Sequence, residues 1–143
     1  MGPEGNANVT VLTLAGADVT WTAGEYLGRT SNVFTFDTDL VDAELMDGGA
    51  VLGFINLFGA SWYPMPITWE NDAGTTRQYI TFTYDLETIT LYAYQTTGLL
   101  LPSVSEYRFL LVREPELLVA AAAAGEVDLA DHDSVVRHLA LPR

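Results

Sequence analysis

The chain has no cysteine and no lysine, and it has only two histidines. Without cysteine it can form no disulfide framework, thiol nucleophile or zinc–thiolate site. Its six basic residues are arginines and stand against 19 acidic residues, so the formal net charge is −13. Binding to phosphate backbones and to anionic membranes depends on clustered Lys and Arg. We therefore expect neither nucleic acid nor an anionic membrane surface as a partner.

Long apolar runs are also missing. No stretch approaches the roughly 20 apolar residues of a membrane-spanning helix, and no charged segment followed by an apolar one opens the chain. We expect no direct membrane insertion, and any signal or anchor would lie upstream of Met1. With 143 residues, 49% of them hydrophobic, the chain is long enough for one packed domain.

The two histidines, His132 and His138, offer little catalytic chemistry. They are six residues apart, which on a helix places them on different faces, and neither has an evident nucleophile to activate. Two such histidines without cysteine make a zinc site improbable. No pair among the 19 acids is singled out for glycoside hydrolysis. We expect a protein that is not an enzyme, with no catalytic residues, metal or cofactor.

Five acidic residues gather between Asp37 and Asp47. Oxygen-rich clusters can hold calcium, which takes 6–8 ligands, but here the glycines follow the acids instead of separating them as in an EF-hand. Helix capping and a solvated acidic face are the favoured interpretation, and calcium binding stays open.

From residue 8 to about 113 the pattern is that of β-strands, with turn signals about every 8–12 residues. This spacing predicts an all-β fold, an antiparallel sandwich or jelly roll of about eight strands. The expected strands are residues 8–14, 18–22, 31–37, 50–58, 61–69, 77–84, 88–94 and 106–112.

Several local features refine this expectation. Ala23-Gly24 signals a turn after the second strand, and residues 50–58 are apolar on both faces, as in a central strand. Pro64 and Pro66 place residues 61–69 at an edge or a bend, because proline cannot donate to a strand ladder. The short 85–87 connection predicts a hairpin.

Helices are expected at two places. Asp39 is a candidate cap for a short helix near 40–46, closed by Gly48. The tail, residues 114–143, should hold one helix ending at Gly125 and a second capped by Asp131. These helices are expected to pack on the sandwich or on a neighbouring subunit.

Residues 1–7 contain two Gly-X-Y triplets, the spacing of a collagen triple helix. We therefore divide the chain into the end of a collagen-like stalk (1–7), a β-sandwich head (8–113) and a helical tail (114–143). Because a Gly-X-Y stalk winds three chains in register, we expect a parallel homotrimer. Apolar residues of the Leu99–Leu101 loop or of the alanine-rich tail would fill its contacts.

The order of motifs resembles the C-terminal globular domain of collagen-like surface proteins and lipoproteins of Bacteroidetes-type bacteria. The resemblance implies an extracellular or outer-membrane setting at the end of a stalk, and it brings no catalytic residues. The chain departs from that pattern at Glu114–Gly125, where its alanine-rich helix is longer. The motifs that carry the resemblance are the Gly-X-Y remnant, Asn6–Val9, Asp39-Leu40, Met46–Leu52, Trp62–Pro66, Ile80–Tyr84, Tyr107–Val112 and Asp133–Leu139.

Aromatic residues supply the candidate site. In a strand-rich fold most of them are core or cross-strand partners, but some can present rings to a sugar. Two hypotheses follow: a trimerising head for structural display or adhesion, and a carbohydrate- or surface-binding module. The candidate ligand-stacking or interface residues are Trp62, Tyr63, Trp69, Tyr92 and Tyr94.

Overall fold

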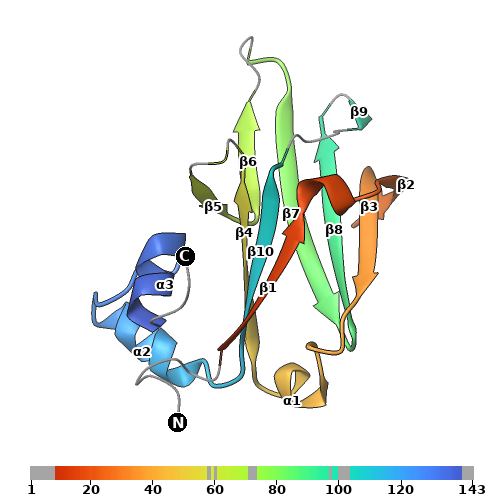
Figure 1. The fold of residues 1–143 in the computed structure, drawn as a ribbon. Coiled ribbons are helices and arrows are strands. Elements are labelled where there is room, and N and C mark those ends of the chain that lie inside the picture. Colours follow the sequence, from red (N-terminus) through yellow and green to blue (C-terminus); the bar gives the residue numbers. More distant parts are fainter. Residues whose placement is uncertain are drawn as a thin grey trace.

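The computed structural model describes residues 9–57, 59, 61–70, 74–96, 98–99 and 104–139, which form an antiparallel β-sandwich with short helices (Figure 1). The predicted all-β sandwich is confirmed. The stalk triplets of residues 1–7 lie outside the described residues, as do Leu100 and Leu101 of the predicted contact loop.

The two sheets are antiparallel throughout. Sheet A has the spatial order β1 (Val9–Ala15), β10 (Glu106–Val112), β4 (Ala50–Asn56) and β5 (Trp62–Pro64). Sheet B has the order β2 (Thr22–Tyr26), β3 (Arg29–Asp37), β8 (Thr88–Gln95), β7 (Arg77–Asp85) and β6 (Ile67–Glu70), and β9 (Gly98–Leu99) also pairs with β8.

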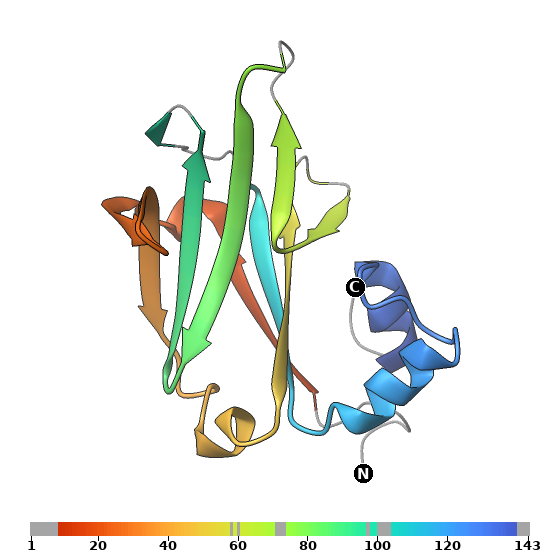
Figure 2. The same ribbon diagram turned by 180° about the vertical axis from the view of Figure 1, so that it is seen from behind.

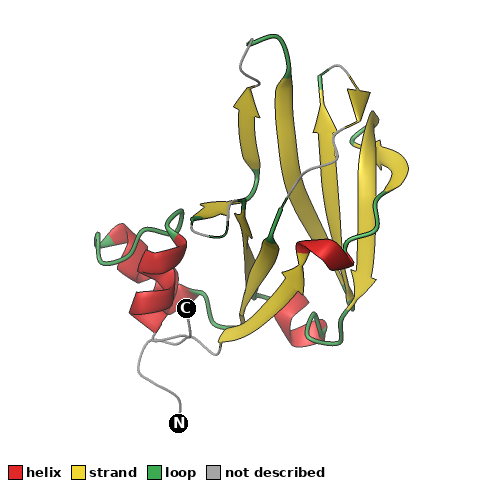
Figure 3. Ribbon diagram, turned by 45° about the horizontal axis from the view of Figure 1, so that its top comes forward, coloured by secondary structure: helices red, strands yellow, loops and turns green. Residues whose placement is uncertain are grey.

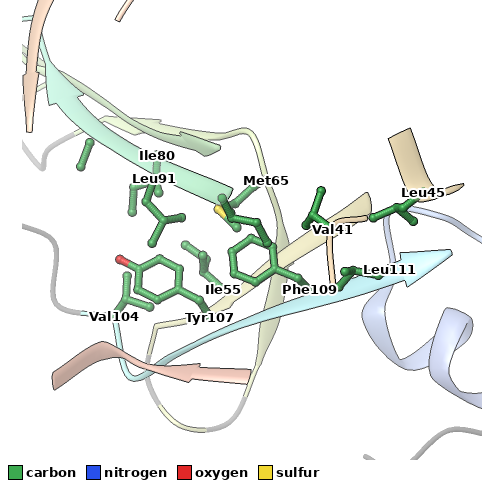
Figure 4. Close-up of a cluster of buried hydrophobic side chains, with 12 residues drawn as sticks. Val41, Leu45, Ile55, Met65, Ile80, Leu91, Val104, Tyr107, Phe109 and Leu111 are labelled. Atoms are coloured by element: carbon green, nitrogen blue, oxygen red, sulfur yellow. The ribbon is translucent and has the colours of Figure 1, made fainter. Parts of the chain in front are cut away.

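The main core lies between the sheets (Figure 4). Tyr107, Phe109 and Leu111 alternate along β10 and are buried there with Ile80 and Leu91 of sheet B. This alternation follows from the two-residue period of a strand, which sends every second side chain to the same face.

Two helices form a third layer on sheet A. α2 (Glu116–Ala123) and α3 (His132–Leu139) pack their buried residues against Leu110 and Val112, the outward residues of β10. Figure 2 is viewed from the side of sheet B, where no described helix crosses the strands. The sandwich therefore has one covered face and one open face.

Strand β4 is central in sheet A, as predicted from its apolar residues on both faces. Its side chains meet the intersheet core on one side and the helical layer on the other. The predicted edge position of Pro64 and Pro66 is also confirmed, because β5 and β6 end their sheets and the chain bends between them at the cis Met65–Pro66 peptide.

The second predicted strand was misplaced. Gly16–Asp18 form a 3-10 turn, and β2 runs from Thr22 to Tyr26 instead of ending there. Ala23-Gly24, predicted as a turn, lies inside β2, where Gly24 pairs with Ser31 of β3. Glycine suits this position because a Cβ on it would lie 2.7 Å from the Val33 side chain. The turn is made by Leu27-Gly28.

The short helix α1 (Ala43–Met46), visible in Figure 3, is shorter than the predicted 40–46. Its cap is Asp42 and not Asp39: the Leu45 backbone N–H donates to Asp42 Oδ1 at 3.0 Å. Residues 38–41, just before α1, form a separate turn in which the Thr38 carbonyl accepts a hydrogen bond from the Val41 N–H. Asp42 has an extended backbone, so the helix begins only at Ala43.

Candidate functional site

The five predicted aromatic residues lie in three different places. Tyr92 and Tyr94 point from β8 to the open face of sheet B, Trp62 lies beneath the helical layer on sheet A, and Tyr63 and Trp69 line a groove at the sandwich edge.

On the open face, four tyrosines form one cluster, which we call the tyrosine face: Tyr26, Tyr79, Tyr92 and Tyr94. Tyr79 lies opposite Tyr94 in the β7–β8 register, and their rings stack at 4.7 Å between centroids with 18° between planes. The Tyr26 ring lies 4.6 Å from that of Tyr92 and 6.0 Å from that of Tyr94. The cluster thus joins three strands, β2, β8 and β7.

Sequence reasoning missed Tyr26 and Tyr79. The hairpin register would have found Tyr79, because a short turn between β7 and β8 sets Asp85 opposite Thr88 and, by counting back, Tyr79 opposite Tyr94. Tyr26 was missed because the strand that carries it was placed too early in the chain.

Arg29 adds a cation to the tyrosine face. It pairs with Tyr26 across the β2–β3 turn, and its guanidinium carbon lies 5.2 Å from the centroid of the Tyr94 ring, a cation–π distance. Partial burial raises the pKa of the Tyr94 hydroxyl, and the charge of Arg29 opposes that rise. The Tyr94 hydroxyl is therefore a neutral hydrogen-bonding group at physiological pH.

The turn between Tyr26 and Arg29 has an unusual residue. Leu27 has φ 50°, a left-handed value that costs a branched side chain energy, and Gly28 follows at φ 80°. The Leu27 side chain is 88% exposed. Positive φ at both residues is the geometry of a two-residue hairpin turn, which places the Leu27 side chain at the exposed rim of the tyrosine face.

Two hollows flank Tyr79. One, of about 240 Å³, is lined by Tyr26, Leu27, Arg29, Tyr79 and Tyr94. The other, of about 340 Å³, is lined by Glu70, Gly74, Thr75, Arg77, Tyr79 and Thr96. In the second hollow Arg77 and Glu70 form an exposed ion pair at 3.0 Å. Hydrogen bonds, first to Glu70 and then to Tyr79, raise the pKa of Arg77.

Threonine hydroxyl groups lie beside these rings on the open face. Thr35 and Thr90 share a hydroxyl hydrogen bond of 2.9 Å, and the Thr83 hydroxyl donates to the Tyr92 hydroxyl at 3.4 Å. Threonine pairs of this kind stabilise the sheet and leave hydroxyl groups along its surface. The tyrosine face is therefore an aromatic island on a hydroxyl-rich sheet.

Trp62 belongs to a buried cluster between β10, β5 and α3. The His132 ring stacks on Trp62 at 4.6 Å, and the Arg108 guanidinium carbon lies 4.4 Å from the Trp62 ring centroid. Arg108 Nη1 lies 3.0 Å from His132 Nε2, and His132 Nδ1 lies 3.1 Å from Asp133 Oδ1. Trp62 is thus an interface residue within the chain, where the tail meets the head.

The contacts of His132 define its protonation. Arg108 can only donate, so His132 Nε2 accepts from it and Nδ1 carries the hydrogen that it donates to Asp133. His132 is 1% exposed, and burial is the largest cause that lowers its pKa. The neutral imidazole is therefore held in place by hydrogen bonds at both ring nitrogens.

Tyr63 and Trp69 line a groove of about 560 Å³ with Leu57, Pro64, Pro66, Ile67 and Thr68. Trp69 also packs against the intersheet core, while Tyr63 is exposed. The described lining of the groove is apolar and carries no charged side chain, so this part of it offers a ligand few directional contacts.

The acidic cluster is divided between two roles. Asp42 caps α1 and accepts from Arg113 Nη1 at 2.7 Å, and this hydrogen bond lowers its pKa. Asp37 and Asp39 line a hollow with Glu87 at the end of the sandwich. Within the described residues no three His, Cys, Asp or Glu side chains are grouped to hold a metal ion.

Within the same residues, no helix combines the length and the apolar character needed to cross a membrane. Comparison of the chain with protein-family models, with curated proteins and with solved structures gives no match. The tyrosine face brings together four aromatic rings, the cation of Arg29 and two hollows.

Proposed function

We propose that this protein is a non-catalytic carbohydrate-binding module and that the tyrosine face holds the glycan. The observation that carries the proposal is the aromatic cluster with an arginine on a sheet face that no described element covers. Tyrosine suits sugars because its ring contacts the apolar faces of a pyranose while its hydroxyl exchanges hydrogen bonds with sugar hydroxyls.

Tyr79 is the residue to which we assign the main ligand contact. Tyr94 is contacted by rings from two sides, Tyr79 and Tyr26, whereas Tyr79 has Tyr94 as its one ring partner among the described residues. Tyr79 also lines both hollows. A sugar that fills either hollow therefore meets the Tyr79 ring.

No catalytic step is assigned to this site. Glu70 is the one carboxylate lining the two hollows among the described residues, and it is paired with Arg77. A glycoside hydrolase needs two carboxyl groups that flank the scissile bond. His132 is held inside the molecule by Arg108 and Asp133.

Retardation in native gels containing soluble polysaccharides tests the proposal. With xyloglucan, galactomannan, mixed-linkage β-glucan and polygalacturonate as probes, we expect at least one to retard the wild-type protein. Tyr79→Ala should weaken that retardation about tenfold, and Tyr26→Ala, on the edge strand, should weaken it as well. Tyr63→Ala, which removes an exposed tyrosine outside the face, is the matched control.

Absence of retardation in all four gels would overturn the proposal. So would equal retardation of the wild type and of a folded Tyr79→Ala or Tyr26→Ala variant. Thermal melting of each variant shows whether it is folded.

A second function is favoured by helix α2. This helix is apolar on every side, yet Leu117 and Val119 are 59% and 57% exposed. Helices of this kind are normally buried, so α2 supports the alternative of a homotrimeric head of a collagen-like protein on the cell surface. Light-scattering mass distinguishes the two: a 15.6 kDa particle at micromolar concentration would remove the trimer, and three times that mass would support it.

A further inference from the structure

We propose that the hollow beside Arg29 selects a sugar that carries a carboxylate, a uronate, and that the Arg29 guanidinium is its partner. This inference rests on the proposed carbohydrate-binding function and specifies its ligand class. It follows from the distribution of charge in the molecule, from the lining of the hollow and from the geometry of guanidinium–carboxylate pairing.

The charge distribution sets Arg29 apart. The chain has 19 acidic residues and six basic ones, so acceptors for an arginine are abundant. Arg29 and Arg137 nevertheless form no ion pair with any described carboxylate, whereas three other arginines do: Arg77, Arg108 and Arg113. Of these two arginines, Arg29 lines the hollow beside the tyrosine face.

Among the described residues, the lining of this hollow contains no acid. Apart from Arg29 it consists of three tyrosines and Leu27. The carboxylate of Glu70 lines the neighbouring hollow on the Tyr79 side and is held by Arg77 at 3.0 Å. A bound anion would therefore meet one unpaired cation and neutral side chains, although the whole molecule is strongly acidic.

Guanidinium and carboxylate groups are geometrically matched. Both are planar, and two parallel N–H···O bonds between them are shorter and roughly twice as strong as neutral hydrogen bonds. The Arg29 guanidinium lies 5.2 Å from the Tyr94 ring centroid, so a uronate carboxylate at Arg29 brings its pyranose ring among the tyrosines. Leu27, exposed at the turn, adds an apolar contact at the rim.

The test compares two ligands that share the same sugar rings and differ at the carboxyl groups, which are charged in one ligand and methylated and neutral in the other. Trigalacturonate and its methyl ester have the same sugar rings, but the ester carries no carboxylate. By isothermal titration calorimetry at about 0.15 M NaCl, where charges beyond about 8 Å are screened, we expect trigalacturonate to bind the wild type about tenfold more tightly than the ester.

Substitution of the arginine should remove this preference. Arg29→Gln should bind the two ligands about equally, and Arg29→Lys, which keeps the charge but loses the planar fork, should fall between. Arg137→Gln removes an exposed positive charge of α3 that pairs with no described carboxylate, and this variant should behave as the wild type. Thermal melting confirms that each variant is folded.

The outcomes separate the two proposals. If the ester binds as well as the acid, or if Arg29→Gln keeps the wild-type preference, the uronate assignment is wrong while carbohydrate binding stands. If dextran sulfate binds and trigalacturonate does not, the site takes another anion and the assignment is also overturned. If neither these ligands nor the four polysaccharides bind, both proposals fail.

Discussion

At the scale of single residues, Gly53 shows how closely the two sheets approach. It lies in β4, and a Cβ on it would be 2.5 Å from a ring carbon of Phe82 and 2.9 Å from Met65 Cε. Gly53→Ala should therefore lower the free energy of unfolding by about 1–3 kcal/mol, the usual cost of overfilling a packed core.

Gly48 is the matched control for this prediction, because a Cβ there has no described atom within 4 Å. Gly48→Ala should change the free energy of unfolding by less than about 0.5 kcal/mol. Urea denaturation measures both variants. Equal effects would show that the sheets are not packed as closely at Gly53 as the structure indicates.

The buried histidine His132 makes the stability of the folded protein depend on pH. Burial lowers its pKa in the folded protein below the ordinary value of 6.5. As the pH falls below about 6.5, the unfolded chain takes up the proton first. The contribution of neutral His132 to stability is therefore fully present above this pH. It is lost as the pH falls toward the lower pKa that His132 has in the folded protein. Protonation would also place a second cation beside Arg108.

Urea denaturation at pH 7.5 and 5.5 tests this expectation. The wild type should be less stable at pH 5.5, and His132→Gln should be less stable overall but should lose most of this difference. His138→Gln, outside the Trp62–His132–Arg108 cluster, should keep it. A His132→Gln variant with the full wild-type pH dependence would assign the effect to other groups.

At the scale of elements, the short helix α1 depends on its N-cap, Asp42. Its Oδ1 accepts from the Leu45 N–H at 3.0 Å and from Arg113 Nη1 at 2.7 Å, so it both caps the helix and links it to the end of β10. Asp42→Ala should lower the melting temperature more than Asp39→Ala, which removes the cap expected from the sequence. The reverse order would restore Asp39 as the cap. Differential scanning calorimetry near pH 7 measures both.

The elements also show what could be predicted from the sequence. The β7–β8 hairpin was predicted nearly to its ends, because its two-residue alternation is strong and its turn is short. The alanine-rich helix α2 was predicted from composition and ends before Gly125, which has φ 79°. These elements are specified by local chemistry alone.

Elements that depend on contacts between residues distant in sequence were predicted less well. Strand β2 was misplaced because a glycine inside it looks like a turn, and the real turn uses Leu27, a residue that turn statistics do not favour. The same error hid Tyr26 from the predicted site. Tyr92 and Tyr94 were identified as candidates, and the hairpin register places Tyr79 opposite Tyr94. Tyr26 comes from β2, a strand distant in sequence from β8, and no local pattern indicates its contacts with Tyr92 and Tyr94.

At the scale of the whole molecule, the two outer faces of the sandwich differ. Sheet A is covered by α2 and α3, and Trp62 is partly buried there against His132 of α3, whereas no described helix crosses the tyrosine face of sheet B. Alternation along a strand gives both sheets an outward face but does not say which one the tail covers. The assignment of function depends on this asymmetry, because it decides which aromatic residues a ligand can reach.

The central claim, that a glycan binds at the tyrosine face, is tested most directly by amide chemical shifts of the ¹⁵N-labelled protein during titration with trigalacturonate and with a xyloglucan heptasaccharide. We predict that the shifts concentrate at Tyr26–Arg29, Tyr79, Tyr92 and Tyr94 for at least one of these ligands. Shifts confined to the Tyr63–Trp69 groove or to α2, or no shifts with either ligand at millimolar concentration, would contradict the account.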